Sequence, residues 1–268
     1  MQWIKEALNK MSKLHLEKIL ELAQSLQDYS AEKITDTPLE ELLPFLQILE
    51  ETARDEKMDA EPAVSKKSPG ASPVIRDFHR QLTVKMEMEQ AQKILAASKP
   101  WPWLRNYYFY KDYHSLITRE QEMAGFAPYE RLAYIGGGAL PLSLILYQQL
   151  FGIRGVSIEK DPELAAISRK VLQKLDLSSH IHVIPGDETL LAEIEFEGFI
   201  VDAQAQPRKR VFTHLHASAP AEAKIVCRAY AGLLNSQLSP EDVSGFQAMD
   251  QCLFSGKVNL SSVLVRKV

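Results

Sequence analysis

The sequence predicts an α/β protein in which a Rossmann-like, mostly parallel sheet follows an all-helical N-terminal domain. Apolar residues at helical spacing fill roughly the first hundred residues. A polar stretch with three prolines interrupts them at about residues 55–73. From Arg131 onward, short apolar strands, turns and helices alternate. We therefore expect a helical domain over residues 1–125, with a mobile loop at about 55–73, and a sheet domain over residues 126–268.

The composition is that of an ordinary globular protein. The 268 residues include 31 Lys and Arg against 35 Asp and Glu, and the net charge of −4 argues against a strongly cationic nucleic-acid binder. Two cysteines exclude a disulfide scaffold. No apolar run approaches the roughly 18 residues that a membrane span needs, and the N-terminus lacks the apolar core of a signal peptide. We expect a cytoplasmic protein without a membrane or nucleic-acid partner.

Three helices are predicted in the N-terminal domain. The first has an apolar stripe with steps of three and four residues, formed by Ile4, Leu8, Met11, His15, Ile19, Leu22 and Leu26. The second begins at Thr37-Pro38, where threonine can cap a helix and proline suits the first turn. The third runs from about Ile75 to Ala97, and an aromatic-rich segment at residues 101–117 follows it.

The second half of the chain predicts the sheet. Strands are expected at residues 131–138, 154–161, 180–188, 196–204, 223–232 and 258–268. Helices are expected between them at residues 140–152, 162–175 and 208–218. Asp161 is placed to cap the second of these helices, and Gly152 closes the first. Repeated strand–helix–strand units favour a parallel sheet with helices on both faces.

Residues suited to binding an adenosine follow successive strands. In a parallel sheet, ligands bind at the carboxyl ends of the strands. Glycines 136–138 let the backbone approach a ligand, Glu159 can accept hydrogen bonds from ribose hydroxyls, and Asp187 can accept one from an adenine amino group. The predicted cofactor-binding residues are Gly136, Gly137, Gly138, Leu140, Pro141, Glu159, Lys160, Gly186, Asp187, Glu188, Asp202 and Ala203. Pro141 removes an amide from the place where a dinucleotide puts its pyrophosphate, which favours S-adenosylmethionine over NAD.

One carboxylate lies within an apolar helical stripe. On the third predicted helix, Glu87 shares a face with Val84, Ala91 and Ile94, and it is the only charged residue of that face. A desolvated carboxylate has a raised pKa and can act as a base near neutral pH. The alternative is a structural ion pair with a basic residue of another helix, such as Arg76 or Arg105.

Four segments resemble the nicotianamine synthase family. These segments are LAYIGGGALPLSLILY, GDETLL, QPRKRVFTHLH and SGKVNLSSVLV, and the likeness extends from about Ile75 to the C-terminus. The length and the single helical N-terminal domain resemble the bacterial branch of this family. That branch includes the histidine 2-aminobutanoyltransferases of opine-metallophore (staphylopine-like) biosynthesis.

The resemblance implies a class I methyltransferase-type sheet used for an unusual transfer. An amine attacks the aminobutyrate arm of S-adenosylmethionine, and 5′-methylthioadenosine leaves. In bacterial relatives the amine belongs to histidine, and the product passes to an opine dehydrogenase. No metal is expected in the enzyme. The alternatives are a nicotianamine synthase that condenses several S-adenosylmethionine molecules, a small-molecule methyltransferase, or a nucleotide-binding module without chemistry. No motif fixes the chirality of histidine, and the N-terminal helices could support a homodimer.

The resemblance also implies catalytic residues. Glu87 matches the family's catalytic glutamate, and Tyr113 matches its active-site tyrosine by a spacing of 26 residues. Arginine suits planar carboxylates, so Arg210 and Arg228 are candidates for holding a substrate carboxylate, with structural ion pairing as the equal alternative. The complete set of predicted substrate-binding residues is His79, Tyr110, Arg210 and Arg228.

Overall fold

The computed structural model describes residues 16–54, 68, 70–230, 234, 244–257 and 259–268. These residues form two compact units that divide between Met86 and Glu87, inside one long helix, α5 (Ala71–Ala96). Tyr230, Leu234 and the short segment around Gly256 belong to the first unit. The boundary predicted at residue 125 therefore lies inside the second unit.

Helices make up the first unit. Residues 16–26 are helical, followed by α2 (Ala31–Asp36), α3 (Leu39–Arg54) and the beginning of α5. Ile19, Leu22 and Leu26 are buried, which confirms this part of the first predicted stripe, whereas its members before residue 16 lie outside the described residues. The rings of Tyr29, Phe45 and Phe78 meet edge to face with centroids 5.5 to 5.8 Å apart and so join these helices.

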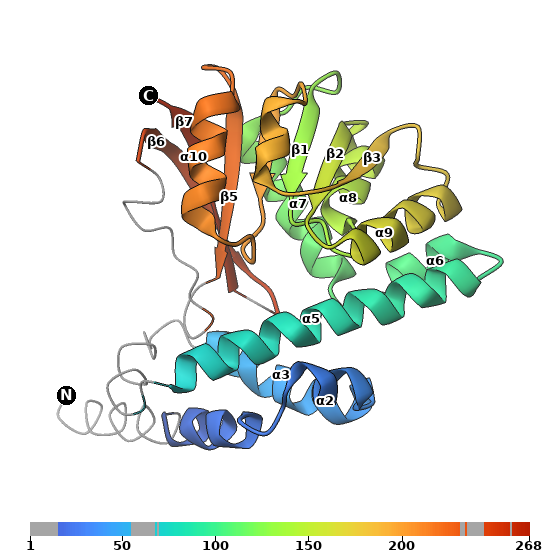
Figure 1. Ribbon diagram of the computed structural model, residues 1–268, viewed down its shortest axis with the longest axis vertical. Coiled ribbons are helices and arrows are strands. Elements are labelled where there is room, and N and C mark those ends of the chain that lie inside the picture. Colours follow the sequence, from blue (N-terminus) through green and yellow to red (C-terminus); the bar gives the residue numbers. More distant parts are fainter. Residues whose placement is uncertain (1–15, 55–67, 69, 231–233, 235–243, 258) are drawn as a thin grey trace. The chain divides into compact units, whose positions relative to one another are not determined.

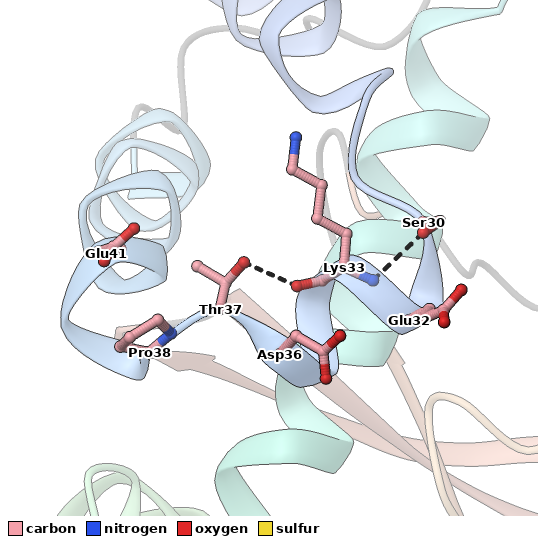
Figure 2. Close-up of a pocket in the computed structure, with 7 residues that line it drawn as sticks. All are labelled: Ser30, Glu32, Lys33, Asp36, Thr37, Pro38 and Glu41. Atoms are coloured by element: carbon pink, nitrogen blue, oxygen red, sulfur yellow. Dashed lines mark hydrogen bonds between the residues drawn. The ribbon is translucent and has the colours of Figure 1, made fainter.

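The turn between α2 and α3 differs from the prediction. Thr37 ends α2 rather than beginning α3, because its hydroxyl donates to the carbonyl of Lys33 at 2.7 Å. The hydroxyl of Ser30 caps the other end of α2 by accepting from the backbone N–H of Lys33. Figure 2 shows both bonds within a surface pocket that contains none of the predicted site residues; it is lined by Ser30, Glu32, Lys33, Asp36, Thr37, Pro38 and Glu41.

Helix α5 begins four residues earlier than predicted. Ala71 to Pro73 were expected to end a loop, yet they form the first turn of the helix. Pro73 fits there because the first turn of a helix makes no use of the proline's missing N–H. Residues 55–67 of the predicted loop lie outside the described residues.

The second unit contains a seven-stranded sheet with helices between its strands, which confirms the predicted α/β fold class. The strand order is β3-β2-β1-β4-β5-β7-β6 (Figure 1). The strands are β1 (Arg131–Ile135), β2 (Arg154–Glu159), β3 (Ile181–Pro185), β4 (Gly198–Val201), β5 (Lys224–Tyr230), β6 (Phe246–Ser255) and β7 (Asn259–Lys267). The pairs β1–β2, β1–β4, β2–β3 and β4–β5 are parallel. Strand β6, at the sheet edge, was not predicted, because Asp250 and Gln251 interrupt the apolar pattern along it.

Six helical segments complete the second unit. They are α6 (Pro100–Arg105), α7 (Tyr110–Ala124), α8 (Leu142–Phe151), α9 (Pro162–Lys174), the 3₁₀ turn η1 (Glu188–Ala192) and α10 (Arg208–Ser218). The predicted ends are confirmed, since Asp161 accepts from the N–H groups of Glu163 and Leu164, and Gly152 adopts the left-handed conformation. None of the helices within the described ranges is long and apolar enough to cross a membrane.

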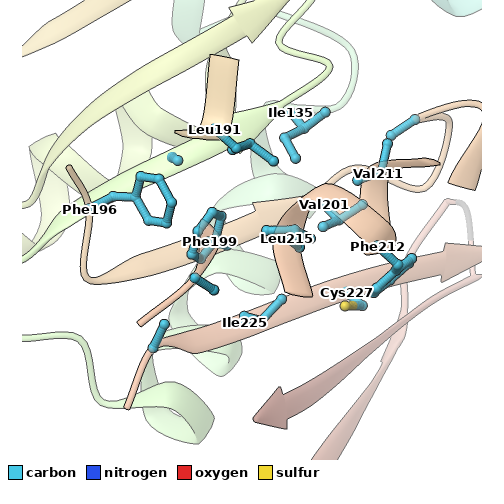
Figure 3. Close-up of a cluster of buried hydrophobic side chains, with 14 of the residues drawn as sticks. Ile135, Leu191, Phe196, Phe199, Val201, Val211, Phe212, Leu215, Ile225 and Cys227 are labelled. Carbon is cyan, nitrogen blue, oxygen red and sulfur yellow. The ribbon is translucent and has the colours of Figure 1, made fainter. Parts of the chain in front are cut away.

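Buried side chains of β1, β4, β5 and α10 form the core on one face of the sheet (Figure 3). Phe199, Leu215 and Ile225 lie at its centre with no exposed surface. The thiol of Cys227 belongs to this core, and burial raises its pKa to about 12, so it is unreactive near neutral pH. This packing fixes β1 beside β4. Because the chain progresses in opposite directions from this pair, the ligand crevice of such a sheet lies at their carboxyl ends.

Candidate functional site

The glycine turn after β1 is tightly folded against its neighbours. Gly136 and Gly138 have φ values of 89° and 62°, which glycine adopts without strain. The N–H of Gly136 donates to the carbonyl of Ile158 at 3.0 Å, and a Cβ on Gly137 would collide with the hydroxyl of Ser157 on β2. The turn therefore lies close over the end of β2.

Glu159 ends β2 and holds the turn through both carboxylate oxygens. Its Oε2 accepts from the N–H of Gly138 at 2.8 Å, and its Oε1 accepts from the N–H of Asp161 at 2.9 Å. Only 8% of the residue is exposed. Glu159, which the sequence predicted to bind ribose, thus joins the glycine turn to the start of α9.

Glu87 lies against the same turn. A Cβ on Gly138 would collide with its Oε2, so the glycine makes room for this carboxylate. The backbone N–H groups of Ala139 and Leu140 donate to it. Burial of the carboxyl raises the pKa of Glu87 well above its ordinary value; the charges of Asp202 and Glu159 add to the rise, and the two amides offset part of it.

No cation of the described residues forms an ion pair with Glu87. The pairing with Arg76 or Arg105 that the sequence left open is absent from this part of the chain. Glu87 is instead a carboxylate of raised pKa that two backbone amides hold, which is an environment suited to proton exchange.

Asp202 stands at the end of β4, directly beside the glycine turn. A Cβ on Gly136 would lie 3.5 Å from the Cβ of Asp202. Its Oδ1 accepts from the N–H of Gln204 at 2.9 Å, and its Oδ2 accepts from the hydroxyl of Tyr134 at 2.7 Å. Glu159 at the end of β2, Asp202 after β4 and Glu87 of α5 therefore lie around the one turn that follows β1.

The amides of this turn bind the protein's own acids. In phosphate-binding turns, backbone N–H groups at a helix N-terminus face the ligand. Here Gly138 donates to Glu159, Ala139 and Leu140 donate to Glu87, and Pro141 at the N-cap of α8 has no N–H. The turn offers negative charge to a ligand, so it suits a cationic group and opposes a phosphate.

The acids after β3 are arranged differently. Asp187 caps η1 by accepting from the N–H and the hydroxyl of Thr189, at 3.1 and 2.6 Å, and these bonds lower its pKa. Arg210 pairs through Nε with Glu188 at 2.7 Å and through a terminal nitrogen with Asp187 at 3.4 Å. Arg210 thus forms an ion pair in this structure, which was the alternative to substrate binding.

Arg228 lies inside the second unit. Its guanidinium is 1% exposed and makes a two-point ion pair with Glu120 of α7 at 2.8 Å. The ring of Tyr113 packs 5.6 Å from this guanidinium, which places the predicted catalytic tyrosine beside Arg228. Arg228, like Arg210, therefore forms a structural ion pair, which was the alternative to substrate binding. Tyr110, at the start of α7, is half-buried.

His79 belongs to the first unit, eight residues before Glu87 on α5. It is 3% exposed, and its ring meets that of Tyr230 edge to face at 5.2 Å. Burial lowers its pKa to about 4, so the ring is neutral at physiological pH. Its Nε2 has no hydrogen-bond partner within the described residues.

The other predicted cofactor residues line the strand ends. Leu140 is buried, Lys160 is exposed, and the N–H of Gly186 donates to the carbonyl of Glu159 at 2.9 Å. The carbonyl of Ala203 accepts from Arg208 at 2.8 Å.

Sequence reasoning missed two residues near the site, Tyr134 and Glu120. Glu120 shares a buried helical face with Leu116, Ile117 and Ala124, which is the pattern that identified Glu87. Tyr134 is the single aromatic residue of the otherwise aliphatic strand β1 after Arg131.

Comparison with known proteins places the chain in a family. The model of the nicotianamine synthase protein family matches residues 8–268. A glutamate-to-glutamine variant of MtNAS in complex with S-adenosylmethionine is 34% identical, with 94% of this chain and 97% of that chain covered and a TM-score of 0.85. MtNAS in complex with MTA and tNA shows the same identity and coverage with a TM-score of 0.87. A search of curated proteins finds no match. The chain therefore belongs to the nicotianamine synthase family.

Proposed function

We propose that this protein transfers the 3-amino-3-carboxypropyl (2-aminobutanoyl) group of S-adenosylmethionine to the amine of histidine and releases 5′-methylthioadenosine. The observation that carries the proposal is Glu87, a partly buried carboxylate of raised pKa held against the glycine turn. Membership of the nicotianamine synthase family supports transfer of this group rather than of methyl. The MtNAS structures with S-adenosylmethionine and with MTA support the same donor and leaving group.

The charge of the turn supports a sulfonium donor. Carboxylates of Glu87, Glu159 and Asp202 surround the turn, and the N–H groups of Gly138, Ala139 and Leu140 already donate to the first two. A sulfonium carries a positive charge and activates the carbon to be attacked, whereas a dinucleotide would bring its pyrophosphate to a negatively charged surface. The residues present therefore fit S-adenosylmethionine better than NAD.

The reaction needs a base because amino acids carry ammonium at neutral pH. A carbon–nitrogen bond forms to the acceptor amine, the carbon–sulfur bond breaks, and sulfur leaves with the electron pair as a neutral thioether. The proton of the amine passes to the carboxylate of Glu87. We assign Tyr113 to hold the acceptor amine, Glu159 to the ribose hydroxyls and Asp187 to the adenine amino group. Arg210 and Arg228 act through the carboxylates they pair with.

Histidine is proposed as acceptor because the length of the chain and its single helical N-terminal region resemble the bacterial branch of the family. The product would keep the primary amine of the transferred arm, which is the group that an opine dehydrogenase can join to a keto acid. The second candidate is nicotianamine synthesis, in which the acceptor amine comes from a further S-adenosylmethionine. The 34% identity to MtNAS over 94% of this chain favours it.

Mass spectrometry of the purified protein separates these reactions. The protein is incubated with S-adenosylmethionine alone, with D-histidine and with L-histidine. Methylthioadenosine together with an aminobutanoyl-histidine adduct is the expected result and gives the chirality. Nicotianamine formed without histidine assigns the second candidate, and S-adenosylhomocysteine would contradict both by showing methyl transfer.

A further inference from the structure

A buried ion pair lies next to the strand ends of the site. Arg228 of β5 and Glu120 of α7 are 1% and 0% exposed, and two hydrogen bonds of 2.8 Å join them. The remaining guanidinium nitrogen of Arg228 donates to the hydroxyl of Ser143 at 2.8 Å and contacts the hydroxyl of Tyr134 at 3.4 Å. Burial of such a pair is costly unless every polar atom is engaged.

The carboxylate of Glu120 also accepts hydrogen bonds from two hydroxyl groups. Besides Arg228, its Oε1 accepts from the hydroxyl of Ser262 at 2.6 Å, and its Oε2 accepts from the hydroxyl of Tyr147 at 3.2 Å. The half-buried thiol of Cys252 is a further titratable group near Glu120. The ion pair is therefore saturated by α8 and β7 at one end and reaches β1 at the other.

Tyr134 is the link between this ion pair and the acids of the glycine turn. Its hydroxyl accepts from Arg228 and donates to Oδ2 of Asp202 at 2.7 Å. The guanidinium itself lies 3.9 Å from the same oxygen. With Oδ1 bound to the N–H of Gln204, each oxygen of Asp202 has a donor other than Glu87.

Resting on the proposed function, we propose that Tyr134 is a positioning residue: its hydroxyl couples the Arg228–Glu120 ion pair to Asp202 and keeps that carboxylate from sharing a proton with Glu87. Glu87 is then left as the group that exchanges a proton with the acceptor amine. Arg228 serves the same end and also supports the ring of Tyr113, 5.6 Å away.

The direction of the effect follows from the charges around the two carboxylates. Asp202 faces Tyr134 and Arg228 from the sheet, and Glu87 faces Asp202 and Glu159. Loss of the Tyr134 hydroxyl removes a donor from Asp202, whose carboxylate can then accept from a protonated Glu87 instead, so ionisation of Glu87 is disfavoured. Glu87 then ionises at a higher pH.

Two tyrosine-to-phenylalanine variants make a matched test. Tyr134→Phe removes the hydroxyl that reaches Asp202, whereas Tyr147→Phe removes a hydroxyl bonded to the same ion pair on its far side. In Tyr134→Phe, the acidic limb of kcat/KM for methylthioadenosine release is expected to move about 0.5–1 pH unit upward. In Tyr147→Phe, the limb is expected to stay at its wild-type pH, although either variant lowers the melting temperature.

Asp202→Asn is expected to shift the acidic limb of kcat/KM in the opposite direction. Removing the like charge beside Glu87 is expected to move the limb downward by about one pH unit. In the double variant Tyr134→Phe, Asp202→Asn, the limb is expected where Asp202→Asn alone puts it, because no charge is left for Tyr134 to stabilise. Should Tyr134→Phe fail to fold, an unchanged limb in Asp202→Asn would still overturn the proposal.

A second readout does not need turnover. The carboxyl ¹³C resonance of Glu87, assigned with Glu87→Gln, is titrated in wild type and in the three single variants Tyr134→Phe, Tyr147→Phe and Asp202→Asn. Its midpoint is expected to follow the same directions. Equal midpoints in wild type and Tyr134→Phe, or equal shifts in both phenylalanine variants, would overturn the role of Tyr134. A wild-type protein that releases no methylthioadenosine would contradict the proposed function alone.

Discussion

Two pairs of acids near the ends of the parallel strands differ in how their charge is balanced. After β3, Asp187 and Glu188 share Arg210. After β2 and on α5, Glu159 and Glu87 are bound by backbone N–H groups, and no cation of the described chain pairs with either. Paired acids are satisfied without a ligand. Acids held only by amide dipoles leave net negative charge, which suits the cationic donor of the proposed function.

The largest expected effect comes from replacing Glu87, the proposed base, which is one of the two acids held by backbone N–H groups. Glu87→Gln keeps the shape of the side chain but cannot take a proton, so turnover is expected to fall by about 10²–10⁴. Binding of S-adenosylmethionine, measured by calorimetry, is expected to persist. Wild-type kcat/KM should rise with pH as Glu87 ionises through its raised pKa.

Glu89→Gln on the same helix is the control, and its turnover is expected to match wild type. Equal turnover in Glu87→Gln and wild type would exclude Glu87 as the base. The acids held by backbone amides would then have no catalytic role to distinguish them from the acids paired with Arg210.

The next effect tests whether Glu87 depends on its glycine. Gly138→Ala and Gly152→Ala both put a side chain at a positive φ, 62° and 71°, so each is expected to cost about 1–2 kcal/mol of stability. Only at Gly138 does the new Cβ collide with Glu87; at Gly152 nothing lies within 4 Å. Glu87 is a flexible side chain and can move aside. Gly138→Ala is therefore expected to lose about 10²-fold in turnover, as expected of a displaced reacting group.

Melting temperatures and methylthioadenosine release measured on both alanine variants separate strain from displacement. Similar turnover in the two variants would show that the position of Glu87 against the turn is unimportant.

His79 in the first unit extends the comparison, because it is a buried titratable side chain that is neutral rather than charged. The pKa of His79 is lowered from 6.5 to about 4 by burial. A lowered histidine pKa gives stability that is fully present above the unfolded pKa and is lost as the pH falls from 6.5 toward 4. At pH 5 the loss amounts to about 2 kcal/mol relative to pH 7.

His79→Leu is expected to remove this part of the pH dependence, as measured by urea unfolding at pH 7 and pH 5. His182→Gln, at an exposed position of β3, is the control and should unfold like wild type at both values. A His79→Leu protein that loses as much stability as wild type between pH 7 and pH 5 would contradict the assignment.

The sequence predicted the parts of this molecule that depend on local patterns. Strand–helix alternation located most of the sheet, Asp161 and Gly152 marked helix ends, and the lone charge in an apolar stripe identified Glu87. The edge strand β6 was not predicted because Asp250 and Gln251 interrupt its apolar pattern.

Other features depend on contacts between distant residues and have no local signature. The amides that bind Glu87 lie more than fifty residues away, and Arg228 meets Glu120 across 108 residues of chain. Sequence alone therefore left the roles of Arg210 and Arg228 open between substrate binding and ion pairing, and only the fold shows their carboxylate partners.

The smallest effect returns to the two groups of acids. Glu159→Gln removes an unbalanced charge, so it is expected to weaken S-adenosylmethionine binding about tenfold, the loss expected of a charged hydrogen bond. Asp187→Asn removes a charge that Arg210 already balances, and it is expected to change affinity by about twofold at most, like an exposed ion pair. S-adenosylhomocysteine lacks the sulfonium charge, and calorimetry should show that Glu159→Gln weakens it less than S-adenosylmethionine. If both ligands lose affinity equally in Glu159→Gln, the carboxylate acts only through a hydrogen bond to the ribose, and unbalanced charge is not what selects the cationic donor.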